Sequence, residues 1–392
     1  MRDNPELPFP IDEYRRRIKK VQAGIADRGI DACLVSIPEN IYYLTGFTTT
    51  GYYMYQTLVI PAEGDPMFVC YLEEKINILR RSWLDRYMTY SVIEDPIEVT
   101  LAALREMGLE DKVLALEEKG LFFPIATYKQ LMAAFPRARW KDGSGIVEQA
   151  RLVKSPLEVN YIRQAAKAAR AGMVAAIAAV EPGKTENDIA AEVYRATLQN
   201  GSEYPGSPPY VVSGERSGLP HGTWEGRVLR EGDIVFLEHS GCIKRYSAAM
   251  MRTCFIGDPP DVVRRHADII LEGLQKAIDT IRPGVTSGEV DFACRNTITS
   301  AGFPNYTHET GYSIGVAYPP GWNECHIMNL HPGDPTVLVP NMVFHLVPSL
   351  IIPEIQGHVG FSDTVLVTEN GCEVLTNVGV ERKLYVLEPV AS

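Results

Sequence analysis

Two residues, His221 and Glu238, have side chains suited to proton transfer and nucleophilic chemistry. His221 ends the loop-like stretch Ser213–His221, and an imidazole with its ordinary pKa can take up and return a proton near pH 7. Glu238 ends the run Gly232–Glu238, whose pattern predicts a strand. Its carboxylate could orient water, bind a cationic nitrogen or act as a nucleophile. The alternatives are a histidine that only hydrogen-bonds to backbone and a carboxylate that is paired with Arg252.

Aromatic side chains gather in a short stretch, 311–324, around a turn at Pro319-Pro320-Gly321. The polar and aromatic candidates in it are Tyr312, Tyr318, Trp322 and Glu324. An aromatic pocket suits a compact ligand that is partly apolar or cationic. The same aromatic residues could equally be packed in the core.

The composition limits the classes of function. A chain of 392 residues predicts two or three domains. Its net charge of −11 comes from dispersed acidic residues, which argues against nucleic acid as a partner. No apolar run reaches the roughly 18 residues of a membrane span, and the first residues lack the apolar core of a signal peptide. Among the seven cysteines there is no CxxC pair, which argues against a thiolate zinc site. We therefore expect a cytoplasmic protein with no membrane partner.

Alternating helices and strands predict a small α/β domain over residues 1–150. Its first helix is expected over 12–28, followed by a turn at Pro38-Glu39-Asn40. The remaining elements are strands at 31–36, 57–60 and 67–71 and helices near 72–82, 95–107 and 124–135.

Residues 151–392 predict an α+β domain, with helices flanking a mostly antiparallel sheet. Ser155 and Pro156 are suited to begin a long Ala-rich helix over 157–180. Further helices are expected at 185–200, 260–280 and 286–301, and strands at 232–238, 246–256, 342–347 and 361–368. Glu238 therefore lies on a strand, and His221 lies in the loop before that strand.

Six segments in one order resemble the creatinase, prolidase and methionine aminopeptidase superfamily. They are 38–47, 151–156, 232–252, 311–315, 340–348 and 363–371. The resemblance spans nearly the whole chain. It implies an α/β creatinase-like N-terminal domain and an α+β "pita-bread" catalytic domain.

The resemblance also implies where metal ligands would lie. Metallopeptidases of this superfamily hold two divalent cations with two aspartates, a histidine and two glutamates. The matching positions in this chain are Glu238, Ala249, Tyr312, Val347 and Ser362. One carboxylate cannot hold two hard cations against water, so we expect no catalytic metal and no other cofactor. A shift of the alignment by one residue would add only Asp363 as a donor.

Further site residues follow from the same resemblance. His221 matches the loop where creatinases carry their catalytic histidine. Because strand side chains alternate, His345 faces the same way as position 347 and is predicted to point into the pocket as a third catalytic residue. Tyr52 lies in a loop that reaches the partner's active site in creatinase-like dimers, so we expect a homodimer. The predicted substrate-binding residues are Tyr52, Tyr312, Tyr318, Trp322, Glu324 and Ser362.

The pocket segments 311–324 and 330–334 resemble ectoine hydrolases, which open a cyclic amidine without a catalytic metal. The glutamates that clamp the guanidinium in creatinase fall on Met251 and Ser362, which disfavours creatine as substrate. We therefore predict metal-independent hydrolysis of a C–N bond (amidine, cyclic amide or guanidino) in a small zwitterionic metabolite. The alternatives are an Xaa-Pro-type metallopeptidase, a carbon–sulfur lyase, and a binding protein without turnover.

Overall fold

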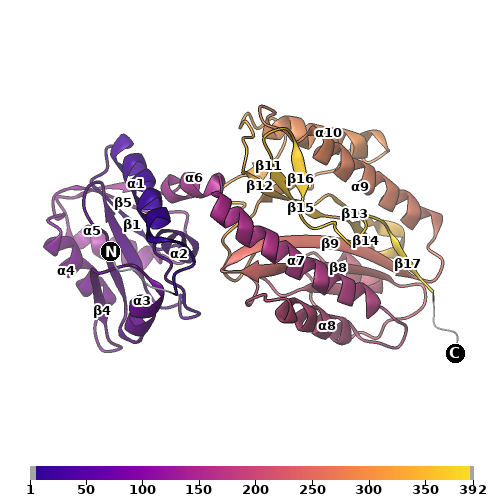
Figure 1. The fold of residues 1–392 in the computed structure, drawn as a ribbon, viewed down its shortest axis with the longest axis horizontal. Coiled ribbons are helices and arrows are strands. Elements are labelled where there is room, and N and C mark those ends of the chain that lie inside the picture. The colour runs from indigo at the N-terminus through magenta and orange to yellow at the C-terminus, as the bar shows by residue number, and fades with distance from the viewer. Residues whose placement is uncertain (1–5, 389–392) are drawn as a thin grey trace. The chain divides into compact units, whose positions relative to one another are not determined.

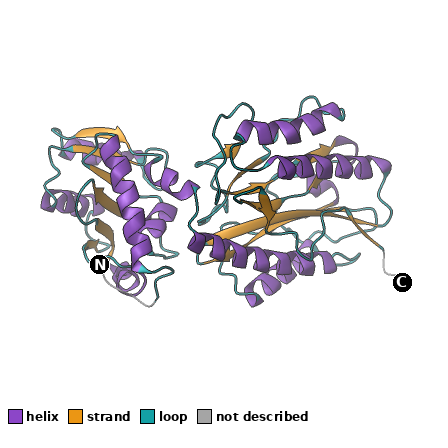
Figure 2. Cartoon of the chain, turned by 45° about the horizontal axis from the view of Figure 1, so that its top comes forward, coloured by secondary structure: helices purple, strands orange, loops and turns teal. Residues whose placement is uncertain are grey.

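The computed structural model describes residues 6–388 of the chain. The chain divides into two compact units, Met1–Arg151 and Leu152–Ser392. In each unit helices flank β-sheet, as Figures 1 and 2 show. No helix among residues 6–388 is long and apolar enough to cross a membrane.

The first unit is built on a six-stranded mixed sheet in the order β4-β3-β2-β1-β5-β6. The central strand β1 pairs antiparallel with β2 and parallel with β5, so the pairing changes from antiparallel to parallel at β1. The strands are β1 (Ala32–Val35), β2 (Thr57–Pro61), β3 (Met67–Tyr71), β4 (Tyr87–Tyr90), β5 (Val113–Leu116) and β6 (Arg139–Asp142). The helices are α1 (Ile11–Asp27), α2 (Pro38–Thr45), η1 (Leu72–Glu74), α3 (Lys75–Arg81), α4 (Pro96–Glu106), α5 (Ile125–Ala134) and α6 (Ile146–Leu152).

The turn expected at residues 38–40 is wrong, because these residues form the first turn of α2. Pro38 occupies the start of the helix, where its missing N–H would have no intrahelical partner in any case. The helix ends at Gly46, whose φ of 76° suits glycine. Asn40 lies on the buried side, where its amide donates to Glu117 at 2.6 Å and to Glu148 at 2.9 Å. A proline followed by polar residues therefore marked a helix start and not a loop.

The second unit begins with two helices whose first turns are closed by capping boxes. Ser155 accepts from the backbone of Glu158 at the start of α7 (Pro156–Ala178), and Thr185 caps α8 (Glu186–Gln199) in the same way. Helix α7 lies beside the long hairpin of β8 (Ile234–Ile243) and β9 (Tyr246–Ile256), and α8 packs against α7 (Figure 1). Strands β7 (Tyr210–Ser213) and β17 (Tyr385–Leu387) complete this sheet in the order β17-β9-β8-β7.

Helix α7 approaches β8 very closely. A Cβ atom on Gly241 would lie 2.2 Å from the carbonyl oxygen of Ala165, and one on Gly172 would lie 2.5 Å from the ring of His239. His239 therefore points into the helix layer. Because side chains alternate along a strand, Glu238 faces the opposite side of the sheet, as the sequence predicted.

A second, five-stranded sheet packs against the other face in the order β11-β10-β12-β15-β16. An isolated bridge between Met251 and Ser362 ties this sheet to β9. The strands are β10 (Gly311–Ser313), β11 (Asn329–Leu330), β12 (Val343–Leu346), β15 (Asp363–Val367) and β16 (Cys372–Val374), with a separate pair β13 (Ser349–Ile352) and β14 (Gly357–Gly360). Helices α9 (Asp261–Thr280) and α10 (Ser287–Ser300) pack with these strands in one apolar cluster.

Candidate functional site

A cavity of about 370 Å³ opens in the second unit beside β7 and β8. Its wall combines aromatic, apolar and titratable side chains from both sheets and from the loop after β7. Four residues that the sequence predicted as site residues lie in this wall: His221, Glu238, Tyr312 and Trp322. Met251 and Val347 also line the cavity, so two positions that resemble ligand or clamp positions present apolar side chains.

Glu238 lies on β8, directly opposite Met251 of β9 and Tyr210 of β7. The expected alternative, a pair with Arg252, is wrong, because Arg252 donates to Asp363 at 3.0 Å in a fully buried ion pair. Within residues 6–388, no hydrogen bond or ion pair holds the Glu238 carboxyl group. Burial raises the pKa of Glu238 to about 8. The cavity therefore presents a carboxyl group that can gain or lose a proton close to neutrality.

His221 lies in the loop that follows the short helix η2 (Gly214–Gly218). Its φ of 55° is left-handed, a conformation that non-glycine residues adopt rarely and often at functional sites. The ring centroids of His221 and Tyr210 are 5.6 Å apart. Because Tyr210 is the β-sheet neighbour of Glu238, the loop brings the imidazole to the same cavity as the carboxyl group.

A chain of hydrogen bonds runs from the cavity wall into the core. The Trp322 indole donates to the Tyr312 hydroxyl at 3.0 Å, and that hydroxyl lies 2.9 Å from Nδ1 of His345. Nε2 of His345 lies 2.6 Å from the Ser362 hydroxyl. Burial, with the nearby Arg252, lowers the pKa of His345 to about 3, so this imidazole is neutral. Burial also raises the pKa of Tyr312 well above its ordinary value, so the phenol keeps its proton.

The prediction that His345 points into the pocket is wrong, although the strand alternation behind it is correct. Tyr312 of β10 is paired with His345 of β12, and side chains paired in this way stand on one face. The larger Tyr312 ring covers His345, which is fully buried and does not line the cavity. Ser362 lies behind His345 and is also fully buried. Both residues therefore contact the cavity only through Tyr312.

Three further predicted binding residues are not part of the cavity wall. Tyr318 packs under Arg245, whose guanidinium carbon is 4.7 Å from the ring centroid. Glu324 forms a buried ion pair with Lys154 at 2.8 Å. Tyr52 belongs to the first unit, where its ring packs edge-on against Phe122 with a centroid distance of 5.5 Å.

Sequence reasoning missed several residues of the cavity wall, among them Tyr210, His308, Glu309 and His358. The ring of His358 stacks on Phe236 with a centroid distance of 4.7 Å and an interplanar angle of 14°. Burial lowers the pKa of His358 to about 4. Tyr210 and His358 reach the site through the pairing of β7 with β8 and of β13 with β14, whereas His308 and Glu309 precede β10. This long-range arrangement leaves no local signal in the sequence.

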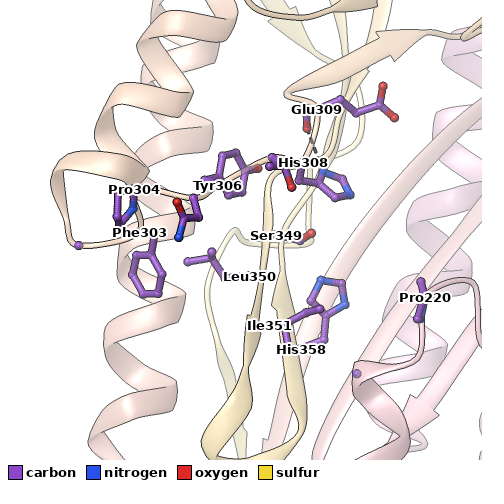
Figure 3. Close-up of a pocket in the computed structure, with 14 residues that line it drawn as sticks. Pro220, Phe303, Pro304, Tyr306, His308, Glu309, Ser349, Leu350, Ile351 and His358 are labelled. Atoms are coloured by element: carbon purple, nitrogen blue, oxygen red, sulfur yellow. Dashed lines mark hydrogen bonds between the residues drawn. The ribbon is translucent and has the colours of Figure 1, made fainter.

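A second, wider cavity of about 830 Å³ adjoins the first. Figure 3 shows its apolar side, with Phe303, Pro304 and Leu350, and its polar side, where His308 and His358 lie. The two cavities share wall residues, namely Pro220, His308, Glu309, Ser349 and His358. The wider cavity is therefore the outer part of the same site.

The five positions that resemble metal-ligand positions do not match the donor set of a dinuclear centre. Ala249 and Val347 carry no donor atom. The Tyr312 and Ser362 hydroxyls are hydrogen-bonded to His345, and Tyr312 is a protonated phenol. Two hard cations require several anionic oxygen ligands, and only Glu238 supplies one here. In the described part of the chain, no three His, Cys, Asp or Glu side chains gather in a way that could hold a metal ion.

Comparison with known proteins places these features in a family. Residues 160–369 match the profile of metallopeptidase family M24, and residues 17–153 match the creatinase/prolidase N-terminal domain. The chain belongs to family M24. It is 32% identical to the ectoine hydrolase of Halomonas elongata, over 97% of this chain and 98% of that protein. It is 28% identical to an Xaa-Pro dipeptidase of Pyrococcus horikoshii, over 95% of this chain and 100% of that protein.

Solved structures of M24 proteins agree with this assignment. Dipeptidase PepE from Mycobacterium ulcerans superposes with a TM-score of 0.83 at 26% identity, covering 97% of this chain and 99% of that chain. The Xaa-Pro dipeptidase from Bacillus anthracis gives 0.81 at 26% identity, over 95% and 100%. The resemblance and the fold class predicted from the sequence are therefore confirmed. The chain is thus an M24 protein in which most of the positions that resemble metal-ligand positions carry no metal-binding side chain.

Proposed function

We propose that this chain is a cytoplasmic, metal-independent hydrolase of a C–N bond in a small zwitterionic metabolite, which is an amidine, a cyclic amide or a guanidino compound. One observation carries the proposal. Among residues 6–388, a Glu238 carboxyl group without a hydrogen-bond partner and the His221 imidazole face one cavity, and no group of side chains there could hold a metal ion. The 32% identity to an ectoine hydrolase supports the class of bond.

Hydrolysis adds the hydroxyl of water to carbon and transfers a proton to the departing nitrogen. His221 takes the proton from water and returns it to that nitrogen. Glu238 holds the substrate nitrogen or the water, or forms a transient ester with the carbon that water then opens. Tyr312 donates a hydrogen bond that polarises the bond under attack, and His345 assists through Tyr312.

The cavity favours an ectoine-like substrate over creatine. Met251 lines the cavity at one of the two positions that resemble the guanidinium clamp, and Ser362 at the other is buried behind His345. A guanidinium group that leaves water needs carboxylate partners at these two positions, and neither position supplies one. Tyr210, Tyr312 and Trp322 suit a compact ring instead.

Turnover of ectoine in the presence of a chelator tests this function. We expect hydrolysis to survive EDTA and to fall about 10²–10⁴-fold in His221→Ala, the range for loss of a general acid–base group. His266→Ala is the matched control, because that ring lies on α9 and is not part of either cavity wall. Loss of activity on chelation, with recovery on adding Mn²⁺, would overturn metal independence.

An Xaa-Pro-type metallopeptidase is the second candidate, because several relatives carry that name. Elemental analysis of the purified protein and an assay with a proline dipeptide separate the two. Stoichiometric metal together with dipeptide cleavage would favour the peptidase. A carbon–sulfur lyase or a protein that only binds its ligand remains if neither ectoine nor a dipeptide is consumed.

We also propose that the protein is a homodimer in which the loop around Tyr52 contributes to the partner's site. The family resemblance supports this arrangement. Mixing Tyr52→Ala with His221→Ala tests it, because a mixed dimer would contain one intact site. Random exchange of protomers should then restore about a quarter of the wild-type activity. No recovery in a sample whose protomers are shown to exchange by energy transfer between differently labelled protomers would contradict the shared site.

A further inference from the structure

Four hydrogen-bonded side chains behind the cavity fix the positions of one another's protons. They are Trp322, Tyr312, His345 and Ser362, and each of these side chains is buried, with 3%, 8%, 0% and 0% exposed. Buried polar groups normally satisfy their donors and acceptors, because an unpaired one loses its water without replacement. The position of each proton in the chain therefore follows from what the neighbouring groups can donate and accept.

Ser362 fixes the first proton. Within residues 6–388, its hydroxyl has one hydrogen-bond partner, Nε2 of His345 at 2.6 Å. If Nε2 carried the proton and donated it, the serine proton would have no acceptor in the core. The serine therefore donates, and Nε2 accepts. A neutral imidazole with an accepting Nε2 carries its hydrogen on Nδ1.

His345 and Trp322 then fix the Tyr312 proton. Nδ1–H of His345 donates to the Tyr312 oxygen at 2.9 Å, and the indole N–H of Trp322 donates to the same oxygen at 3.0 Å. Both lone pairs of the phenol oxygen are then occupied. The phenol proton cannot be given to either neighbour, and no other described residue lies within hydrogen-bond distance to accept it. Tyr312 lines the cavity, so the cavity is where an acceptor must come from.

We propose that Ser362 and His345 are positioning residues that hold the Tyr312 hydroxyl proton toward the cavity, where it donates to a hydrogen-bond acceptor on the substrate. The acceptor is the carbonyl oxygen of an amide, or the oxygen that water adds to the carbon of an amidinium group, whose two nitrogens both carry hydrogen. This role rests on the proposed function only for the identity of the substrate. The direction of the donor is a property of the free protein.

If the hydrogen bonds were donated in the opposite direction, the cavity would select a different ligand. If Nε2 of His345 carried the hydrogen, Nδ1 would accept from the Tyr312 hydroxyl, and Tyr312 would then offer the cavity only an acceptor. The cavity would favour a cationic N–H group on the ligand. One tautomer of one buried histidine therefore decides whether Tyr312 donates or accepts.

NMR of the full chain labelled with ring-¹⁵N histidine reads this tautomer directly, without substrate. The signals of His345 are assigned by their loss in His345→Gln. We expect the pattern of a neutral ring with hydrogen on Nδ1, unchanged between pH 6 and pH 8. Hydrogen on Nε2, or a doubly protonated ring, would overturn the proposal whatever the enzyme's reaction is.

Kinetics with ectoine give the second test. Tyr312→Phe should lower kcat about 100-fold and Ser362→Ala about tenfold, while KM changes less than about threefold. In the Tyr312→Phe background, Ser362→Ala should change kcat less than twofold, because the donor that Ser362 orients is already absent. Fully additive losses would show that Ser362 acts by another route.

Ser287→Ala is the matched control for the loss of a buried serine. Ser287 is on α10 and is not part of either cavity wall. Its hydroxyl donates to the Asn329 carbonyl at 3.1 Å. We expect it to lower the melting temperature about as much as Ser362→Ala and to leave kcat unchanged. If Ser362→Ala does not fold, Ser362→Thr, which keeps the hydroxyl, takes its place and should retain most of kcat. If ectoine is not turned over, ectoine is excluded as the substrate, and the tautomer still decides the positioning role.

Discussion

The ammonium group of Lys154 lies 2.8 Å from the carboxylate of Glu324, and both side chains are only 1% exposed. Lys154 also donates to the Ser313 hydroxyl at 3.2 Å, and that hydroxyl donates to the same carboxylate at 3.0 Å. The two charges therefore satisfy each other inside the second unit. Glu324 therefore stabilises the loop behind the aromatic wall and is not part of the cavity wall.

Glu324→Gln should destabilise the protein by about 3–5 kcal/mol, because it leaves the Lys154 charge buried without its counter-charge. The double variant Lys154→Met/Glu324→Leu should lose less, because no isolated charge remains. Thermal or urea unfolding measures both. Arg163→Ala is the control, since its pair with Glu373 is about 40% exposed and such pairs contribute about 1 kcal/mol or less. A large rise in KM of Glu324→Gln with unchanged stability would instead show that Glu324 binds the substrate.

The raised pKa of Glu238 predicts a pH-dependent stability. An unfolded glutamate ionises near its ordinary value of 4.5, whereas the folded one holds its proton to about pH 8. Between these values the folded state binds more protons, so stability falls as pH rises and levels off above about 8. Glu238→Gln removes this slope. We expect its melting temperature, relative to the wild type, to be higher at pH 8 than at pH 5 by at least 2–4 °C, the shift from about 1 kcal/mol. Equal differences at both pH values would contradict the raised pKa.

The same pKa predicts the pH profile of turnover. Each role proposed for Glu238, whether it holds a cationic nitrogen, orients water or acts as a nucleophile, uses the ionised carboxylate. We expect kcat/KM for ectoine to rise about tenfold per pH unit below pH 8 and to reach a plateau above it. Glu238→Asp, which keeps the charge, should retain a rising profile at lower activity. A profile that falls through pH 8 would mean that Glu238 acts as a proton donor.

The sequence was informative where a residue's position on one strand or loop decides its role. Glu238 was predicted because it occupies a position that resembles a metal-ligand position of the family, and His221 because its loop resembles the one that carries the catalytic histidine of creatinases. Tyr312 and Trp322 were found because an aromatic cluster beside a proline-rich turn is visible locally. The family fold was predicted from ordered segments, and the comparisons confirm it.

The errors concern depth and long-range pairing. Strand alternation places His345 on the correct face, but it does not show that Tyr312 from another strand covers it. Glu324 was predicted to bind ligand, and its ion pair with Lys154 was not foreseen because the two residues are 170 positions apart in the sequence. Tyr210 was missed because its neighbour, Glu238, is defined by the register of β7 against β8. A short sequence window contains neither depth nor register.

The close approach of α7 to β8 predicts that this contact fixes the position of the strand that carries Glu238. Gly241 lies three residues after Glu238 on β8, and a Cβ there would meet the Ala165 carbonyl at 2.2 Å and the Ala169 amide nitrogen at 2.9 Å. Neither backbone atom can move without shifting the helix. Gly241→Ala should therefore cost about 1–3 kcal/mol of stability and lower turnover by displacing the strand that carries Glu238. Gly371→Ala is the matched control, because no atom lies within 4 Å of its added Cβ, and it should change stability by less than about 0.5 kcal/mol. A Gly241→Ala protein with wild-type melting temperature and activity would show that this contact does not fix the strand.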